Sequence, residues 1–436
     1  MKRRRSRPRK SWLKALASDR RGNVFELDGY AAVGMADGVS VPLTRDQSVN
    51  TPFGSELMLL PDRQPVVYNI RKGQLETLRE NPYAPGHPIY PVAVFNSPGY
   101  VVTYVSAYQM NTGAGILPLF SYGAVGWSRG RFRSAALCID RERRQDIRRM
   151  KPEDVRAGIA EKRRSMPANR LREHLEKCAT VYGCPAAKNF FLKRYEAPLP
   201  TSPRCNARCR GCLSRQENPE IPRSQDRIDF VPTAEEITEV ALSHIHVVRR
   251  AVVSFGQGCE GDPLLAADAI EPAIRMIRTA TRRGTIHLNT NGSLPGVLDR
   301  LLEAGLDSLR ISLNSVREDF YQAYFRPRGY RFADVLASID HALRRKKFVS
   351  INYLNCPGFT DTVEEREALA TFLGRYPIHM IQWRNLNFDP QRYWKIMARA
   401  GKSGPPLGMP DMVAAIQKRF SGLMHGYFNP PRQRFA

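Results

Sequence analysis

Residues 204–212 read Arg-Cys-Asn-Ala-Arg-Cys-Arg-Gly-Cys, and this stretch decides how the rest of the chain is interpreted. It separates Cys205, Cys209 and Cys212 by three and two residues, so that all three thiols can turn toward one point. A structural zinc site is normally closed by four protein ligands, whereas three thiolates leave one iron of a four-iron cluster without a protein ligand. The stretch therefore predicts an iron–sulfur site with one open corner.

Three other interpretations of these cysteines are open from the residues alone. A group of buried core cysteines is disfavoured, because the arginines and the asparagine of the same stretch are too polar for a core. A zinc knuckle would need a distant histidine as its fourth ligand. A disulfide with a spare thiol suits a secreted protein, but Met1-Lys2-Arg3-Arg4-Arg5 is not followed by the apolar core of a secretory signal.

Length and composition indicate an ordinary globular protein. The chain has 436 residues, of which 42% are apolar, and this is enough for two or three domains with a large core. No apolar run approaches the roughly 18 residues that cross a bilayer. Eight cysteines suit a reducing compartment in which an iron–sulfur cluster is stable. We therefore expect a cytoplasmic protein without a transmembrane segment.

The chain is strongly basic, with a formal net charge of +25. Much of the excess lies between Lys2 and Lys14, which we interpret as a flexible basic arm. The remaining charge is scattered over arginine-rich segments, and no nucleic-acid-binding module is recognisable. Two interpretations stay open: an ordinary solvated surface, or contact with RNA or an anionic surface through the arm.

Sequence patterns divide the chain into five segments. Leu171, Leu175 and Cys178 share one helical stripe, so Cys178 is predicted to face a core. The segments are a basic flexible arm (1–22), a β-rich N-terminal domain (23–150), a helical connector (151–193), a barrel domain (194–390) and a C-terminal extension (391–436).

Six strand-and-helix repeats follow one another in the barrel domain, which implies a parallel sheet. His287 and Asn289 share one face of their strand, so one face of the sheet is polar. A polar face favours a barrel that encloses a site at the carboxyl ends of its strands. Six repeats are too few for a closed eightfold barrel. The predicted fold is therefore α/β, an incomplete (βα)6 TIM-like barrel, with strands over 195–200, 250–255, 285–291, 306–314, 348–355 and 379–387.

Residues 255–263 read Phe-Gly-Gln-Gly-Cys-Glu-Gly-Asp-Pro and lie between the second strand and its helix. The match to Gly-x-Gly-x-x-Gly would also suit a dinucleotide fold, but that fold carries its glycines after the first strand and leaves the cysteines unexplained. Glycine at positions 258 and 261 lets the backbone approach a ligand closely.

The Cys-x3-Cys-x2-Cys stretch and the turn Gly261-Asp262-Pro263 together resemble the radical S-adenosylmethionine (SAM) enzymes, whose Gly-Glu-Pro turn has Glu where this chain has Asp. The resemblance covers residues 195–387. It implies a 4Fe–4S cluster on Cys205, Cys209 and Cys212. It also implies reductive cleavage of SAM to a 5′-deoxyadenosyl radical that abstracts hydrogen from a substrate. The SAM contacts that it implies are Gly258, Gly261, Asp262, Asn291, Ser312 and Asn314.

Other expectations concern the surroundings of this site. The resemblance implies an electron donor such as flavodoxin or ferredoxin, and the barrel should be sealed by the N-terminal domain or the C-terminal tail. Trp383 and Arg384 are candidates to face the substrate, which the sequence does not identify. Catalytic residues also stay unknown. An auxiliary cluster on any of Cys178, Cys184, Cys259 and Cys356 is left open. The alternative function is a basic zinc-containing nucleic-acid-binding protein without catalysis, which differs from the first in metal content.

Overall fold

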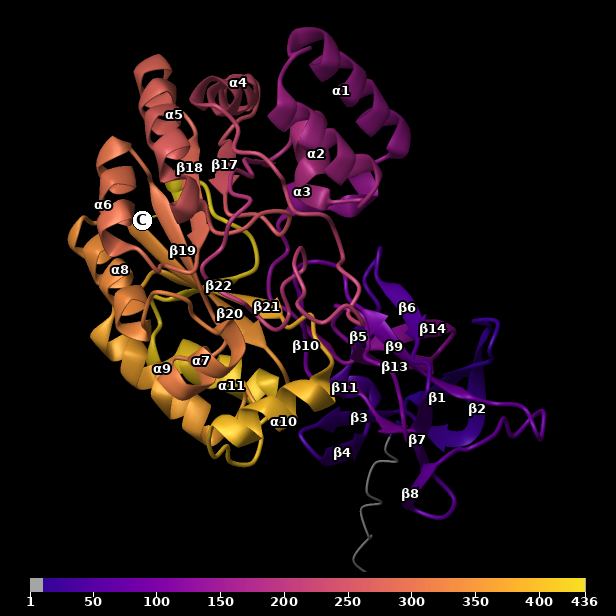
Figure 1. Cartoon of the computed structure of the whole chain (residues 1–436). Helices are drawn as coiled ribbons and strands as arrows, with labels where there is room; N and C mark the ends of the chain where they lie inside the picture. Colours follow the sequence, from indigo (N-terminus) through magenta and orange to yellow (C-terminus); the bar gives the residue numbers. More distant parts are fainter. Residues whose placement is uncertain (1–10, 436) are drawn as a thin grey trace, which may run out of the picture.

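The computed structural model describes residues 11–435, which form a β-rich N-terminal part, a helical connector and a parallel-sheet part (Figure 1). None of the helices in this range combines the length and the apolarity that a membrane crossing requires.

The N-terminal part is built from short antiparallel strands. Thirteen of them join into one extended sheet system, and β10 and β15 pair separately. The strands are β1 Lys14–Ser18, β2 Val24–Ala31, β3 Val33–Ala36, β4 Val39–Pro42, β5 Val49–Asn50, β6 Glu56–Leu59, β7 Arg63–Asn69, β8 Gln74–Thr77, β9 Tyr90–Phe95, β10 Tyr100–Val102, β11 Val105–Ser106, β12 Tyr108–Met110, β13 Gly123–Ser128, β14 Arg131–Ser134 and β15 Ala136–Cys138.

Strand β1 corrects the prediction that residues 1–22 form a flexible arm. It pairs with β2, β9 and β13 in the middle of the sheet system. Leu13 and Ala17 are fully buried, while the Lys14 side chain stays half exposed. The small apolar side chains fit between neighbouring strands, and this burial outweighs the charge that suggested an arm. Residues 1–10 of the predicted arm lie outside the described residues.

The connector contains α1 Pro152–Ser165, α2 Arg170–Thr180 and α3 Pro185–Phe191. Asn169 caps α2, because its side-chain oxygen accepts from the backbone N–H of Arg172 at 2.9 Å. As predicted, Leu171, Leu175 and Cys178 are buried on one face of α2. This helix packs against α3 and α4.

The third part is a seven-stranded parallel sheet whose strands are arranged in sequence order, an open half-barrel. The predicted count of six strands is too low, because β22 in the C-terminal extension pairs with β21. This strand has only three residues, Met-His-Gly, and carries no periodic signal. The strands are β16 Glu196–Pro198, β17 Val252–Phe255, β18 Thr285–Thr290, β19 Ser308–Leu313, β20 Phe348–Asn355, β21 Met380–Asn385 and β22 Met424–Gly426.

Helices α5, α6, α8 and α9 lie along the outer side of this sheet (Figure 1). Their apolar sides face the strands: Ile270, Ile274 and Ile277 of α5 are fully buried, each contributing about 1.5–3 kcal/mol. The helices are α4 Ala234–Ile245, α5 Ala267–Ala280, α6 Pro295–Ala304, α7 Glu318–Phe325, α8 Phe332–Arg344, α9 Val363–Arg375, α10 Pro390–Ala400 and α11 Met409–Arg419.

The inner face of the sheet is polar, as predicted. His287 shares a hydrogen bond of 2.6 Å with the Ser308 hydroxyl and one of 2.9 Å with Asn289 Oδ1. Burial and the neighbouring Arg310 lower the pKa of His287 to about 3, so the imidazole is neutral at pH 7.

The N-terminal part closes the carboxyl ends of the strands. The backbone N–H of Val102 donates to Asn385 Oδ1 at 2.9 Å, and the Asn355 amide donates to the Val102 carbonyl at 2.8 Å. A buried ion pair of 3.1 Å joins Arg63 of β7 to Asp389, the residue before α10. These contacts fix the N-terminal part over the end of the sheet where the site is expected.

Candidate functional site

A cavity of about 420 Å³ lies at the carboxyl ends of the parallel strands. Two loops form one side of it: the cysteine loop (residues 204–212) and the glycine loop (residues 256–262). Strands β18 to β21 contribute the inner wall. Phe95 and Tyr427 complete it, so the N-terminal part and the C-terminal segment both cover the cavity as predicted.

The cysteine loop is held by the end of α7. The backbone N–H groups of Arg208 and Arg210 donate to the carbonyls of Phe325 and Tyr324 at 2.9 and 3.1 Å. A Cβ at Gly211 would lie 2.8 Å from the Tyr324 hydroxyl, so only glycine fits this close approach. Helix α7 is absent from the sequence-based prediction, although it positions the predicted ligands.

The three thiols of the cysteine loop all line this cavity. Burial raises the pKa of Cys205 to about 12 and that of Cys209 well above its usual value, and neighbouring thiols raise both further. The thiolates of Cys205 and Cys209 are therefore costly here unless a cation accompanies them. Arg227 supplies one positive charge, because its Nη2 donates to Cys212 Sγ at 3.4 Å. The donor set suits a metal centre.

The number of these thiols is what favours a cluster over a closed structural zinc site. Three thiolates leave one iron of a four-iron cluster without a protein ligand, whereas a structural zinc site normally has four protein ligands. Among residues 11–435, the close group of three metal-ligating side chains does not include Cys205, Cys209 or Cys212.

The glycine loop packs directly on the cysteine loop. Its Gly261 N–H donates to the Ser202 carbonyl at 2.6 Å, and the Asp262 N–H donates to the Arg204 carbonyl at 2.9 Å. A Cβ at Gly261 would lie 1.9 Å from the Arg204 carbonyl oxygen. The expected reason for glycine was access for a ligand, but the structure shows contact between two backbones. At Gly258 a Cβ would meet the mobile end of the Gln225 side chain at 2.6 Å.

Glu260 holds the glycine loop, and sequence reasoning missed it. Its buried carboxylate accepts from the backbone N–H groups of Gly256 and Gln257 at 2.7 Å each. It also accepts from those of Thr201 and Ser202 at 2.8 and 3.0 Å. Burial raises the pKa of Glu260 to about 7, although these hydrogen bonds lower it. The sequence signal that could have identified Glu260 is an acidic residue inside a glycine-rich turn directly after an apolar strand.

Asp262 and Asn291 connect the two loops to β18. The Asp262 carboxylate accepts from the Thr290 hydroxyl and from the Asn291 backbone N–H, both at 2.7 Å. The Asn291 amide in turn donates to Asn206 Oδ1 at 2.8 Å. Both side chains are therefore occupied in positioning the cavity wall, and their contact with SAM stays a prediction.

The structure separates Ser312 from Asn314. Ser312 lines the cavity. Strand β19 ends at Leu313, so the alternation of sides that paired the two residues stops before Asn314. The fully buried Asn314 amide donates to the Phe320 carbonyl at 3.0 Å and to the Tyr393 hydroxyl at 3.2 Å. The packing of Asn314 thus gives no support to the predicted contact with SAM.

Two cations face the inner side of the cavity, Arg310 of β19 and Arg384 of β21. Burial and the neighbouring Arg384 lower the pKa of Arg310 to about 9, so it stays charged at neutral pH. Its Nε is buried without a hydrogen-bond partner. Trp383 points away from the cavity, because its indole N–H donates to His425 Nδ1 at 2.9 Å. Of the two predicted substrate-facing residues, the structure brings only Arg384 to the site.

This arrangement agrees with a family comparison. Residues 199–373, which include both loops and most of the sheet, match the model of the Radical SAM superfamily. These residues form a radical SAM domain. The family uses a 4Fe–4S cluster and SAM. The three thiols on one cavity, the raised pKa values of Cys205 and Cys209, and the cation beside Cys212 fit such a cluster.

Curated relatives match part of the chain. The GTP 3′,8-cyclase of Chlorobaculum tepidum is 28% identical over 197 residues, which are 42% of this chain and 54% of that protein. Molybdenum cofactor biosynthesis protein 1 of Dictyostelium discoideum is 32% identical over 160 residues, which are 36% of this chain and 24% of that protein. The chain spans about half the length of the GTP 3′,8-cyclases that it matches.

Solved structures resemble part of the chain more distantly. A radical SAM methyltransferase from Sphaerobacter thermophilus is 16% identical with a TM-score of 0.38, and the match covers 53% of this chain and 65% of that one. Methylornithine synthase is 13% identical with a TM-score of 0.38, and the match covers 64% of this chain and 76% of that one. The family assignment depends on the sequence match, not on these structures.

Proposed function

We propose that the chain is a radical SAM enzyme in which Cys205, Cys209 and Cys212 bind a 4Fe–4S cluster and the cavity beside them binds SAM and an anionic substrate. The observation that carries the proposal is the convergence of three half-buried thiols, the glycine loop and two arginines on one cavity. When bound, the cluster supplies the electron that cleaves SAM reductively.

The residues of the chain would hold the cosubstrate in place and exclude water from the cavity. Glu260 and Asp262 fix the glycine loop against the cysteine loop, so the cosubstrate would meet a rigid wall. Phe95 of the N-terminal part covers the strand ends, which keeps water from a reactive radical. Ser312 presents a hydroxyl to the cavity, and we propose that it contacts SAM.

Arg310 and Arg384 favour an anionic group in the cavity, either the carboxylate of SAM or an anionic substrate. Both arginines stand on strands, where their position is well fixed. Two matched relatives are named GTP 3′,8-cyclases. We therefore propose a phosphate-bearing nucleotide as the substrate class, with GTP as the first probe.

A second cavity, of about 760 Å³, is also lined by Cys209 and Cys212. Eight cationic side chains and one carboxylate, that of Glu217, line it. A surface of this charge attracts acidic proteins and increases their association rate. We propose it as the docking site of an acidic electron donor such as flavodoxin or ferredoxin. Salt should then slow reduction by the protein donor but not reduction by dithionite.

The test of the proposed function combines metal content with SAM cleavage. After anaerobic reconstitution we expect a brown protein with about four irons per chain, and 5′-deoxyadenosine when SAM and dithionite are added. Full iron binding by the triple variant Cys205→Ala, Cys209→Ala, Cys212→Ala would overturn the proposal. The alternative, a zinc-containing nucleic-acid-binding protein, predicts zinc without iron and an RNA or DNA affinity that falls steeply with salt.

Contact of the N-terminal segment with RNA or an anionic surface also stays a proposal, as does the cytoplasmic location. Because β1 begins at Lys14, a deletion that tests this contact should stop before Trp12. Removal of residues 2–10 should weaken capture of an RNA or anionic-surface substrate while SAM cleavage survives. Unchanged capture would remove the idea.

A further inference from the structure

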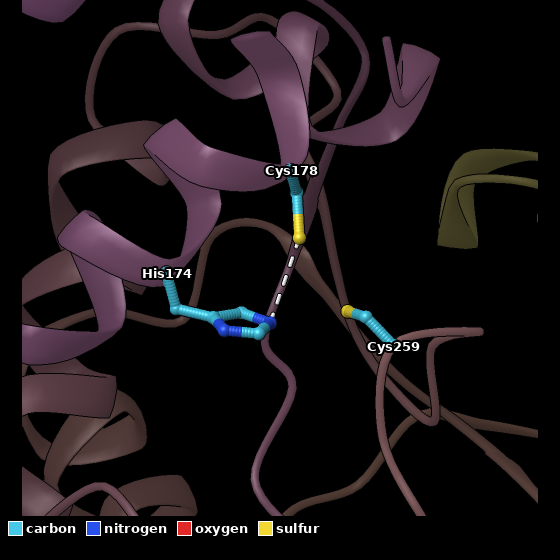
Figure 2. Close-up of side chains that lie close together, drawn as sticks. All are labelled: His174, Cys178 and Cys259. Atoms are coloured by element: carbon cyan, nitrogen blue, oxygen red, sulfur yellow. Dashed lines mark hydrogen bonds between the residues drawn. The ribbon is translucent and has the colours of Figure 1, made fainter. Parts of the chain in front are cut away.

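A second group of metal-ligating side chains lies outside the cavity, between the connector and the radical SAM domain. His174 and Cys178 belong to α2, and Cys259 belongs to the glycine loop. One ligand atom from each residue lies within 4.8 Å of the other two. Figure 2 shows the imidazole and both sulfurs turned toward one another from the two elements. We call these three residues the His–Cys group.

The geometry of the His–Cys group is that of ligands around one ion. His174 and Cys178 are four residues apart and so share one face of α2. The distance from His174 Nε2 to Cys178 Sγ is 3.5 Å. A tetrahedral zinc with bonds of about 2.3 Å to sulfur and about 2.0–2.1 Å to nitrogen places these atoms about 3.5 Å apart. Among residues 11–435, the three thiols of the cysteine loop are not in a close group of this kind.

From this geometry we propose that His174, Cys178 and Cys259 bind one Zn²⁺ ion that joins the connector to the glycine loop. Sulfur and imidazole are the ligands that zinc takes in structural sites. The two cysteines are buried, and the half-buried His174 leaves a route for the ion. The backbone N–H of Cys184 donates to the Cys178 carbonyl at 2.9 Å, which brings this residue next to the group, and its thiol or a water would take the fourth position.

A zinc ion here would fix the glycine loop from outside the cavity. Cys259 directly precedes Glu260, whose carboxylate holds the same loop from inside. The Cys259 carbonyl accepts from the Ile228 N–H at 2.8 Å, so the loop backbone is already anchored at this residue. Zinc would add the link from this anchor to α2. This proposal does not depend on the proposed function, because it needs neither SAM nor the cysteine loop.

The experiment measures zinc and iron separately in the full chain, purified anaerobically. Wild type should carry about one zinc per chain in addition to its iron. In His174→Ala and Cys259→Ser, zinc should fall at least about fivefold while iron is retained. His246→Ala and Cys138→Ser are matched controls, because these residues lie outside the group, and they should keep the zinc.

X-ray absorption at the zinc edge of the wild-type protein supplies a second measurement that needs no variant. We expect sulfur at about 2.3 Å and nitrogen at about 2.0–2.1 Å. Absence of zinc from wild type, zinc that persists in both variants, or a zinc shell of oxygen and nitrogen alone would each overturn the proposal. Iron in place of zinc at these residues would also overturn it. Wild-type protein that carries zinc but no iron would instead contradict only the proposed function.

Discussion

The two groups of cysteines differ in how the chain assembles them. The cysteine loop brings its three thiols from one stretch of nine residues, and they line an open cavity. The His–Cys group takes its ligands from a helix and from a loop about eighty residues further on, and it holds them within 4.8 Å. Three thiols on an open cavity suit a reactive cluster, whereas ligands gathered closely between two elements suit a structural ion.

The largest expected effect would come from Cys209→Ser, which separates the two groups by function. We expect loss of iron and a decrease of about 100-fold or more in 5′-deoxyadenosine formation, with the zinc content unchanged. Metal analysis and SAM cleavage measure the two effects. Cys356→Ser is the control, since this thiol belongs to neither group. If Cys209→Ser keeps both its iron and its activity, the proposed difference in function between the two groups of cysteines is contradicted.

Glu260→Gln tests the residue that lies between the two groups. Each of the two carboxyl oxygens accepts two backbone N–H groups, and the NH2 group that glutamine carries in place of one oxygen cannot accept them. We expect the free energy of unfolding to fall by about 2–4 kcal/mol at pH 5, as measured by denaturant titration. Glu303→Gln, on the surface, should have little effect.

The stability of Glu260→Gln should also depend on pH differently from that of the wild-type protein. The pKa of Glu260 is raised from 4.5 to about 7, so between these values the folded protein binds more protons than the unfolded chain. Wild-type stability therefore falls as pH rises through this range, and the glutamine variant lacks this loss. The difference between variant and wild type should shrink between pH 5 and pH 8. A difference independent of pH would contradict the assignment.

Gly261→Ala sharpens the comparison, because it separates the two loops without removing any ligand. The new Cβ would lie 1.9 Å from the Arg204 carbonyl oxygen, so the cysteine loop must shift. We expect a loss of about 1–3 kcal/mol in unfolding free energy and weaker iron binding, with zinc retained. Gly374→Ala on α9, where the added Cβ meets nothing within 4 Å, is the control. Equal iron binding in both variants would show that the loops are not coupled.

The smallest expected effect concerns which side of the cavity binds SAM. Ser312→Ala should weaken SAM binding by about 3–10-fold, the value of one hydrogen bond, with stability unchanged. Asn314→Ala should leave SAM affinity unchanged and lower stability, because its amide pairs inside the core. Calorimetric titration with SAM measures both. The reverse result would restore the sequence-based prediction for Asn314.

Local patterns allowed the strands of the sheet, its polar face and the cysteine loop to be predicted. The spacing of the three thiols and the alternation of His287 and Asn289 with apolar residues can both be read from neighbouring residues alone. What escaped prediction depends on tertiary contact. Strand β1 begins at Lys14, where the basic segment ends, and β22 is too short to show a period.

The functional residues that escaped prediction share the same cause. Glu260 acquires its role from Thr201 and Ser202, about sixty residues earlier in the chain. Cys178 was correctly predicted to face a core, but nothing in its helix indicates that Cys259 meets it there. Distances of this kind become visible only when the chain is folded.

The backbone of Val102 links the N-terminal part to the sheet: its N–H donates to Asn385, and its carbonyl accepts from Asn355. Its amide proton can exchange with solvent only when the N-terminal part leaves the strand ends. The hydrogen-exchange rate of this amide therefore reports how often the N-terminal part uncovers the cavity at the strand ends. A bound nucleotide that requires the closed form should slow this exchange.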